Sequence, residues 1–473
     1  MSSEYEMRLR KQFLRGCCII PMALAPLISP AAVFIVNPGE RIQDAVKQAV
    51  SGDTVRVMPG LYQETVYIDK DGVSLTGVAV DGVRPILDGG KKGLHDGIIA
   101  SGHGVIIEGF HVRNYRSNGI TTQGANNFRI HNNIVENIHL YGIFPQFGKN
   151  GLVSQNIISR SSDAGIYVGM SQNIDVIANE VFDNALGIEV ENSHYVLIEA
   201  NYVHDNSVGI PVVIIPGLQT KTSADIIVRN NTVVNNNSKL YNRDGAVMAM
   251  MRTGRGIAVT AVDRVTIEGN IIRDHQSCGI CMNSMSRMGN AFPVDAAIEP
   301  EPDETRIFGN IFVNNGYAAA GLGVAGAFIE NGADIVNLAR GKAHCYADNQ
   351  GATTLGTSQW ATCDPALSSA DVQSYRLAEP VESPALSAAQ KAQLTYHAVC
   401  SGCHAYGHTM IGPPMMVIQA LYVNNPEGLA QWIAAPTKKR PIEDYPAMPP
   451  QDYLSEELRL DLAKYILEEV GAD

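Results

Sequence analysis

The chain has 473 residues, and 35 Lys and Arg against 48 Asp and Glu give it a formal net charge of −13. This length is enough for two or more domains. The acidic balance excludes a nucleic acid as partner, because neutralising phosphates needs a basic surface. Many glycines and few aromatic residues are typical of short strands joined by tight turns.

Residues 1–32 have the pattern of an export signal. Basic residues between Arg8 and Arg15 precede an apolar run over 16–32 that ends in small residues. The run contains three prolines and is short for a membrane span, so a cleaved signal fits it better than an anchor does. The prediction is a periplasmic or secreted protein with no stable membrane span after cleavage.

The segment that follows the signal predicts a helix and then strands. The apolar positions of residues 41–50 fall on one helical face, and Gly52 supplies a stop. Short runs of β-forming residues, each closed by Gly or Asp-Gly, begin at Thr54. A helix in this place would cover the open end of a stack of strands and prevent pairing with another chain.

A glycine followed by Ile or Val recurs through the middle of the chain. Most steps are 22 or 23 residues, and two are close to doubled steps. Such a step fits one coil of a β-solenoid with three short strands. The Ile after each glycine then forms an inward apolar ladder. The glycines are Gly97, Gly119, Gly142, Gly165, Gly187, Gly209, Gly256, Gly279 and Gly323.

An Asn follows most of these glycines at a distance of 14 residues. Stacked coils place equivalent residues about 4.8 Å apart. The Asn side chains are therefore expected to bond to their copies above and below at one corner of the stack. These residues are Asn133, Asn156, Asn179, Asn201, Asn270 and Asn337.

Two segments carry a resemblance to a known family. GDTVRVMPGLYQE at 52–64 resembles the opening coil of the right-handed parallel β-helix proteins, the pectin-lyase-like and NosD-like repeat proteins, and NALGIEVENS at 184–193 resembles their repeat. The resemblance covers about 33–365. It implies a mainly β fold, a right-handed parallel β-helix with an N-terminal capping helix. It does not imply one activity, since the fold hosts lyases, hydrolases, esterases, epimerases and non-enzymes.

The repeat also locates insertions near 215–223, 235–252 and 283–303. Long loops on a rigid scaffold often build or cover a site. The residue after each inward Ile points outward, and we expect these side chains and nearby arginines to form a groove that binds a glycan or a protein. A solenoid surface is polar in any case, and no catalytic residue is assigned. The groove residues are Phe144, Gln146, Tyr167, Glu189, Glu191, Arg243, Arg252 and Arg255.

Residues 366–386 are rich in Ala, Ser, Pro and Glu and are predicted to be a flexible linker. After it, Cys400, Cys403 and His404 form C-x-x-C-H, the pattern of covalent haem attachment. Two thiols can add across the haem vinyl groups, and the adjacent imidazole can bind the iron.

The segment 387–473 resembles a small class I cytochrome c along its whole length. The resemblance implies an all-α domain with one covalent haem c, with His404 and Met448 as iron ligands and the carbonyl of Pro413 orienting His404. Other sulfurs compete with Met448, namely Met410, Met415 and Met416. Basic residues at 438–440 could attract a redox protein partner, and a solvated charge run is the alternative.

Four further cysteines remain in the mature chain. Cys345 and Cys363 flank a Gly/Thr/Ser-rich loop and are predicted to pair in an oxidising compartment. An extended stretch from Cys278 to Cys281 would span about 10 Å, too far for a disulfide. With nearby methionines these two thiols could bind Cu(I), but packing in the core is the favoured interpretation.

Two hypotheses about the whole chain stay open. In the first, the haem carries single electrons and the β-helix docks a glycan or a protein. In the second, the β-helix is a carbohydrate-active enzyme, an oxidoreductase, lyase or epimerase, that passes electrons to the haem. The sequence favours the first, because it has no motif for a second redox cofactor. Whether the protein is an enzyme is not decided at this level.

Overall fold

The structure of the protein is a computed structural model. The part of the chain that it describes comprises residues 31–238, 253–287, 295–319, 332–437 and 448–471. Apart from its last two residues, the predicted export signal therefore lies outside the described residues. Among the described residues, no helix combines the length and apolar character needed to cross a membrane.

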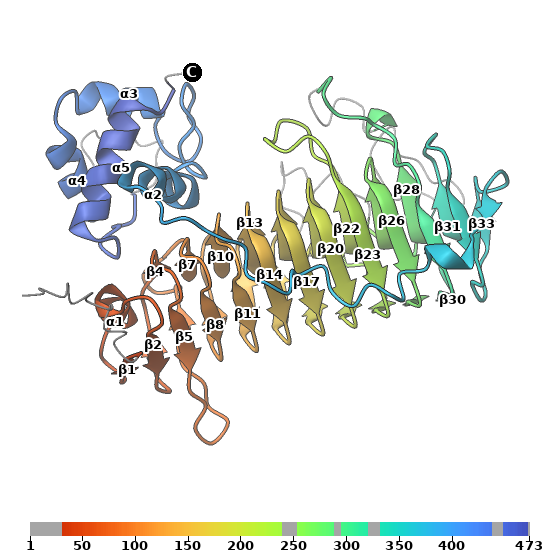
Figure 1. The fold of residues 1–473 in the computed structure, drawn as a ribbon, viewed down its shortest axis with the longest axis horizontal. Helices are drawn as coiled ribbons and strands as arrows, with labels where there is room; N and C mark the ends of the chain where they lie inside the picture. Colours follow the sequence, from red (N-terminus) through yellow and green to blue (C-terminus); the bar gives the residue numbers. More distant parts are fainter. Residues whose placement is uncertain (1–30, 239–252, 288–294, 320–331, 438–447, 472–473) are drawn as a thin grey trace, which may run out of the picture. The chain divides into compact units, whose positions relative to one another are not determined.

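Most of the described chain winds into a stack of parallel strands that form three sheets (Figure 1). The first sheet has 13 described strands: β1 (Val33–Val36), β2 (Thr54–Val57), β5 (Ser74–Gly77), β8 (Ile106–Glu108), β11 (Arg129–His131), β14 (Lys149–Ser154), β17 (Gln172–Ile177), β20 (His194–Glu199), β23 (Ala224–Arg229), β26 (Asp263–Glu268), β29 (Arg306–Phe308), β32 (Cys345–Ala347) and β34 (Ala361–Thr362). The second has 11: β4 (Val66–Ile68), β7 (Ile98–Ala100), β10 (Ile120–Gln123), β13 (Ile143–Gln146), β16 (Ala164–Gly169), β19 (Leu186–Glu191), β22 (Val208–Val213), β25 (Arg255–Thr260), β28 (Cys278–Asn283), β31 (Ala333–Asn337) and β33 (Thr354–Leu355). The third has 10: β3 (Leu61–Tyr62), β6 (Ile86–Asp88), β9 (His111–Arg113), β12 (Ile134–Ile138), β15 (Ile157–Ser161), β18 (Glu180–Phe182), β21 (Tyr202–His204), β24 (Thr232–Val234), β27 (Ile271–Arg273) and β30 (Ile311–Val313). Successive strands pass from sheet to sheet, so the fold is the parallel β-helix that the repeat predicts.

The repeat glycines are required because successive coils approach closely on the second sheet. A Cβ at Gly119 would lie 2.5 Å from the carbonyl oxygen of Gly142, and a Cβ at Gly142 would lie 2.5 Å from that of Gly165. The Ile after each glycine points into the stack. The predicted inward ladder is confirmed by side chains that are all fully buried: Ile98, Ile120, Ile143, Ile166, Ile188, Ile210, Ile257 and Ile280.

Asn side chains bond from coil to coil along one corner of the stack. Asn133 Nδ2 donates to Asn156 Oδ1 at 3.1 Å, and Asn156 Nδ2 donates to Asn179 Oδ1 at 3.0 Å. The predicted corner ladder is thereby confirmed. It continues with the same pattern through Asn201, Asn231, Asn270, Asn310 and Asn349.

The last step of the predicted repeat is wrong. Gly323 lies outside the described residues, and the position of Gly279 is taken in the next coil by Asp334, because Ile280 pairs with Ile335. Asn337 therefore belongs to β31, and Asn349 occupies the ladder. The long segment between β30 and β31 lies within this coil, so counting from Gly323 misses the corner.

A second ladder, which the sequence analysis did not identify, runs along another corner. Asn184 Nδ2 donates to Asn206 Oδ1 at 2.9 Å, and Asn206 Nδ2 donates to Asn236 Oδ1 at 2.9 Å. His275 takes the next place. Its Nε2 lies 3.1 Å from Asn236 Nδ2, and its Nδ1 lies 2.8 Å from Asn315 Oδ1.

The N-terminal end of the stack is covered by α1 (Ile42–Gln48), as predicted (Figure 1). Ile42, Ala45 and Val46 are buried against the first coils. The backbone amides of Ile42 and Gln43 donate to the carboxylate of Glu64 at 2.9 and 3.1 Å, which holds the start of the helix.

The segment 366–386, here called the strap, differs from the flexible linker expected from its composition. Its backbone is hydrogen-bonded to side chains of successive coils. The bonds include Ser369 N to Glu268 Oε2 at 2.8 Å, Tyr375 N to Asp175 Oδ1 at 3.1 Å, Leu377 N to Asn150 Oδ1 at 2.8 Å and Val381 N to Asn127 Oδ1 at 2.8 Å. The strap therefore runs along the first sheet from late coils back to early ones.

The strap leads into a domain of short helices. These are α2 (Ala388–Thr395), a π-helical turn at Tyr396–Cys400, α3 (Met415–Leu421), α4 (Pro426–Ala434) and α5 (Glu456–Glu468). Ser387 and Gln390 form a capping box at the start of α2. The last helix packs on α2 and buries Leu458, Leu462 and Ile466 in the helical core.

The helical domain contacts the first coils directly. Tyr67 of β4 is buried in the core of that domain, and its hydroxyl lies 2.9 Å from Thr395 Oγ1. Arg41 Nη1 and Lys47 Nζ donate to the side chain and the backbone carbonyl of Asp452 at 3.3 and 3.0 Å. The core of the helical domain is thus completed by a side chain from the β-helix.

Candidate functional site

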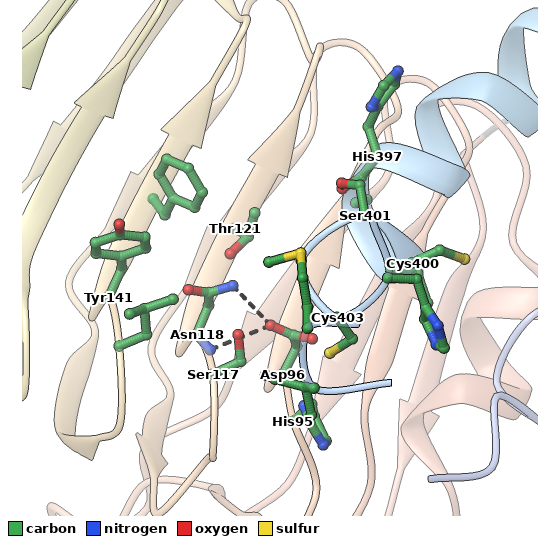
Figure 2. Close-up of a pocket in the computed structure, with 18 of the residues that line it drawn as sticks. His95, Asp96, Ser117, Asn118, Thr121, Tyr141, His397, Cys400, Ser401 and Cys403 are labelled. Carbon is green, nitrogen blue, oxygen red and sulfur yellow. Dashed lines mark hydrogen bonds between the residues drawn. The ribbon is translucent and has the colours of Figure 1, made fainter. Parts of the chain in front are cut away.

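A cavity of about 1070 Å³ is lined both by the second sheet and by the helical domain (Figure 2). This volume is at the upper end of the range of about 300–1,000 Å³ that small-molecule sites have. The helical domain contributes every residue that the sequence assigns to the haem, namely Cys400, Cys403, His404, Pro413 and Met448.

His404 is held in one orientation by its own loop. Its Nδ1 donates to the carbonyl oxygen of Pro413 at 2.7 Å, which leaves Nε2 for another partner. Burial lowers the pKa of His404, so the ring is a neutral imidazole that can bind a metal. A Cβ at position 412 would lie 2.3 Å from Cε1 of His404, so the loop needs glycine there.

The two thiols of the C-x-x-C-H motif are free and line the same cavity. Burial raises the pKa of Cys400 to about 12, so this group is a protonated thiol. Met448 and Met410 also line the cavity, whereas Met415 is buried in the helical core. Two free thiols, a neutral imidazole and a thioether around one cavity fit a c-type haem.

The second sheet brings the predicted groove residues to this cavity. Register places Tyr167 beside Glu189 and Gly169 beside Glu191 on neighbouring strands. Phe144 and Gln146 lie one coil earlier. The cavity is lined by Phe144, Gln146, Tyr167, Glu189, Glu191 and Arg255, while Arg243 and Arg252 lie outside the described residues.

These side chains are buried, although an outward row on a solenoid is expected to be exposed. Phe144, Tyr167 and Glu189 are only 8%, 5% and 6% exposed. Phe144 and Tyr167 pack with each other and with neighbouring side chains of the second sheet. The helical domain and residues of two insertions, Leu218 and Met285 among them, line the same cavity. The groove residues therefore form a buried wall of the cavity.

Three rings and two carboxylates form an aromatic–acidic cluster on this wall, defined as Tyr141, Phe144, Tyr167, Glu189 and Glu191. The rings of Phe144 and Tyr167 are stacked at 4.5 Å with a 9° interplanar angle. Tyr141 is tilted against both, at 4.8 and 4.7 Å between centroids. The Tyr167 hydroxyl donates to Glu191 Oε1 at 2.7 Å.

Both carboxyl groups of the cluster have raised pKa values. Burial, followed by repulsion from Glu191 and Asp163, raises the pKa of Glu189 well above its usual range. Burial also raises the pKa of Glu191 to about 7, although the hydrogen bond from Tyr167 acts in the opposite direction. A carboxyl group with such a pKa can exchange a proton near neutral pH.

A second row of cavity residues, not predicted from the sequence, includes Asp96, Asn118 and Tyr141 (Figure 2). Each directly precedes a repeat glycine, so the repeat itself contains the signal. Asp96 Oδ1 accepts from the backbone N and the Nδ2 of Asn118 at 3.2 and 2.9 Å. Burial raises the pKa of Asp96 to about 6.

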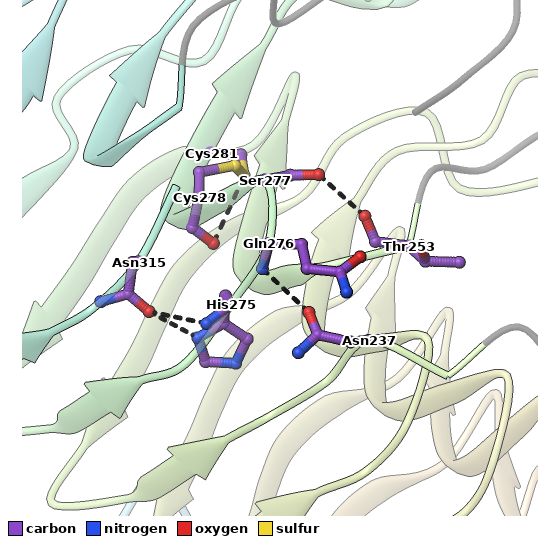
Figure 3. The surroundings of a disulfide bond; sticks show 8 residues. All are labelled: Asn237, Thr253, His275, Gln276, Ser277, Cys278, Cys281 and Asn315. Carbon is purple, nitrogen blue, oxygen red and sulfur yellow. Dashed lines mark hydrogen bonds between the residues drawn. A yellow bond between two sulfur atoms is a disulfide. The ribbon is translucent and has the colours of Figure 1, made fainter. Parts of the chain in front are cut away.

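Two disulfides lie in the described part of the β-helix. Cys345 and Cys363, the predicted pair, are joined, with 4.8 Å between their Cα atoms. Cys278 and Cys281 are also joined (Figure 3). The prediction that excluded this second pair is wrong: the two Cα atoms are 5.8 Å apart, so the chain is bent over these residues instead of extended.

The disulfide between Cys278 and Cys281 argues against the Cu(I) site that the sequence left open. Both sulfurs are bonded to each other, so neither is a thiolate ligand, and the described residues contain no group of three or more His, Cys, Asp or Glu placed to hold a metal ion. The methionines at 248, 250, 251 and 288 lie outside the described residues. Two disulfides fit an oxidising compartment, periplasmic or extracellular.

Comparisons with known proteins concern the β-helix. The sequence matches the family model described as "Right handed beta helix region" over residues 66–214 and 118–292. No curated protein matches the chain significantly.

Several solved structures are similar to this chain. The A-module of the Azotobacter vinelandii mannuronan C-5 epimerase AlgE4 has 16% identity and a TM-score of 0.48, covering 68% of this chain and 94% of that one. Pectate lyase Pel9A has 14% identity and a TM-score of 0.40, covering 71% and 82%. An alginate lyase from Paenibacillus sp. has 12% identity and a TM-score of 0.37, covering 70% and 97%. Similarity at this level does not extend to activity, whereas the matched family model and the three parallel sheets agree on a right-handed parallel β-helix.

Proposed function

We propose that this protein is a c-type cytochrome whose covalent haem exchanges single electrons with a molecule held against the second sheet of the β-helix. The observation that supports this function best is the shared cavity. Residues suited to attach a haem and residues suited to bind a ligand line one space of about 1070 Å³. An electron would therefore have to cross only the boundary between two occupants of the same cavity.

The residues of the helical domain have distinct roles in this proposal. Cys400 and Cys403 would attach the haem, His404 and Met448 would bind its iron, and the carbonyl of Pro413 holds the His404 ring. When bound, the haem would supply a one-electron redox centre. Because these side chains of the helical domain would all serve the haem, recognition of the second molecule is left to the β-helix.

The second sheet supplies recognition and a proton acceptor. Phe144 and Tyr167 offer apolar faces, and Glu191 has a pKa of about 7. Glu191 Oε2 can accept a proton from a bound molecule that is oxidised in the cavity, because only Oε1 is bonded to Tyr167. The second electron partner would be a redox protein outside the cavity.

A second candidate function is carbohydrate chemistry by the β-helix alone. It is favoured by the two buried carboxyl groups, which lie two residues apart on one face of β19 and have raised pKa values. Such a pair can act as acid and base on a glycan. In that case a sugar product forms without any change in the oxidation state of the haem.

The test starts from full-length protein matured with haem. Met448→Ala is expected to abolish the sulfur-to-iron absorption band and to lower the reduction potential, because the thioether ligand is lost. Met410→Ala is the matched control, since Met410 lines the same cavity, and it should leave both unchanged. Protein without covalent haem, or a band that depends on Met410 instead of Met448, would contradict the assignment.

The same oxidised samples, kept anaerobic, separate the two functions. Haem reduction by a member of a panel of sugars and amines, slowed in Glu191→Gln, supports electron exchange in the cavity. Conversion of a glycan with the haem still oxidised supports carbohydrate chemistry. Reduction only by another redox protein would leave the β-helix as a scaffold and contradict both.

A further inference from the structure

The carboxylate of Glu189 has no partner among the described residues. The side chain is 6% exposed and lines the cavity. It accepts no hydrogen bond and forms no ion pair there, and the groups that act on it are the like charges of Glu191 and Asp163. Burying a carboxylate without a donor or a cation is costly, so this arrangement points to a ligand that supplies one.

Glu191 also has room for a hydrogen-bond donor or a cation from a ligand. It lies two residues along β19 and therefore on the same face as Glu189, and it is 8% exposed. Its single described hydrogen bond is the one from the Tyr167 hydroxyl, which leaves acceptor capacity on both oxygens. No cationic side chain is among the groups that shift either carboxyl pKa. Arg255 lines the same cavity but is not among the groups that shift either carboxyl pKa. Among the described residues, the two carboxylates therefore have no cationic partner.

The rings beside these carboxylates define the kind of cation. Tyr141, Phe144 and Tyr167 lie within 4.8 Å of one another between centroids, and Tyr167 is the direct neighbour of Glu189 in the register. An organic cation is attracted to the face of an aromatic ring when it lies within about 6 Å of its centre. A bare metal ion instead prefers a shell of oxygen ligands, which ring faces do not supply.

We propose that the aromatic–acidic cluster binds an organic ammonium group, held between the two carboxylates and the ring faces. This inference rests on the proposed function in that the ligand is the second occupant of the haem cavity. An amino sugar and a simple amine share the chemistry that the cluster recognises. The two carboxylates disfavour an acidic glycan, because a third carboxylate would add repulsion.

Titration calorimetry on the full-length holoprotein tests the inference with glucosamine, glucose, ethanolamine and calcium chloride as probes. Glucosamine should bind, and glucose should bind roughly 10- to 100-fold more weakly because it lacks the charge-assisted hydrogen bonds. Binding of ethanolamine as well would identify a general amine site, and its absence would identify an amino sugar site. Equal binding of glucose and glucosamine, or binding of calcium in place of both amines, would overturn the inference.

Variants locate the binding. Glu189→Gln should weaken glucosamine binding by roughly 10- to 100-fold. Glu180→Gln is the matched control, because Glu180 is a half-exposed carboxylate on β18 outside the cavity, and it should have no effect. Tyr141→Leu removes a ring face and leaves both carboxylates, so it tests the site even where Glu189→Gln fails to fold. Wild-type affinity in both cavity variants would overturn the proposed location.

The haem spectrum of each sample keeps the two proposals apart. Glucosamine binding without haem reduction supports the ammonium site and counts against electron exchange in the cavity. Haem reduction by a neutral sugar, with no binding of glucosamine or ethanolamine, supports electron exchange in the cavity and counts against the ammonium site.

Discussion

The ring of His404 is packed against the backbone of Gly412 so closely that the loop admits no side chain there. The carbonyl of the next residue, Pro413, accepts the Nδ1 hydrogen bond of the same ring. One short segment thus sets both the position and the tautomer of the proposed iron ligand. Contacts that orient a metal-binding His commonly change metal affinity by about 10- to 100-fold when they are lost.

Gly412→Ala should therefore impair haem binding. Its Cβ would lie 2.3 Å from His404 Cε1, so the ring must move. We expect roughly tenfold less holoprotein, measured as covalent haem per polypeptide. Gly407→Ala is the control in the same loop, because a Cβ there has no neighbour within 4 Å. Equal haem content in both variants would show that the ring position does not matter.

The residues proposed to hold a haem could be named from the sequence because covalent attachment fixes their spacing. Cys400, Cys403 and His404 must be adjacent in the chain to reach one porphyrin. Asp96 and Tyr141 could not be named, because their role depends on which coils face the cavity. Packing of the helical domain on the early coils determines which coils line the cavity, and no local sequence pattern predicts that packing.

At the scale of elements, the two corner ladders hold the coils in register. In the second ladder His275 stands where other coils have Asn. Its neutral ring donates from Nδ1 to Asn315 Oδ1 and accepts at Nε2 from Asn236 Nδ2. Burial lowers the pKa of His275 to about 4. A proton added at Nε2 would also set two donors, Nε2 and Asn236 Nδ2, against each other.

This ladder position predicts a pH dependence of stability. The pKa of His275 is about 4 in the folded protein and 6.5 in a model peptide, so the unfolded chain takes up the proton first as the pH falls. The contribution of neutral His275 to the free energy of unfolding is fully present above pH 6.5. As the pH falls from 6.5 to 4, the free energy of unfolding decreases by up to about 3 kcal/mol. His275→Asn should restore an all-Asn ladder and reduce this loss, measured by urea unfolding at several pH values.

The control for this prediction is His408→Asn, since His408 is exposed and belongs to no ladder. It should retain the wild-type loss of stability on acidification. If His275→Asn and His408→Asn behave alike, the acid sensitivity arises elsewhere in the protein.

The sequence predicted the coils well because each coil repeats the same contacts. The inward Ile and the first Asn ladder follow from one spacing, and both are present. The spacing failed at Gly323, where an insertion lies inside the coil and Asp334 takes the repeat position. The bend at Cys278 was also missed, because the sequence prediction assumed a fully extended strand from Cys278 to Cys281, whereas the two Cα atoms are only 5.8 Å apart.

At the scale of the whole molecule, the helical domain depends on the β-helix for part of its core. Tyr67 is 2% exposed, packs at 6.5 Å from Tyr453 and bonds to Thr395 and Ser101. Composition alone predicted two independent domains and a flexible linker. The contact between Tyr67 and Thr395, which are 328 positions apart, has no signature in the sequence around either residue.

Tyr67→Ala should destabilise the helical domain by about 3–5 kcal/mol, the usual cost of truncating a buried aromatic side chain. Urea unfolding followed by haem absorbance should show an earlier transition, while the β-helix signal in far-ultraviolet circular dichroism should change less. Tyr202→Ala, at a 41% exposed position on β21, is the control and should cost about 1 kcal/mol or less. Coincident transitions in both variants would show that the domains unfold as one unit.

The strap also sets an order of assembly. Its hydrogen-bond partners belong to coils as much as 257 residues earlier in the chain, so each bond requires a coil that is already stacked. The strap follows these coils in the chain and therefore settles only after they have stacked. The helical domain, which follows the strap, is placed on the first coils only then. On the proposed function, haem attachment at Cys400 and Cys403 and closure of the cavity become consecutive steps, and the β-helix is the template on which the helical domain is completed.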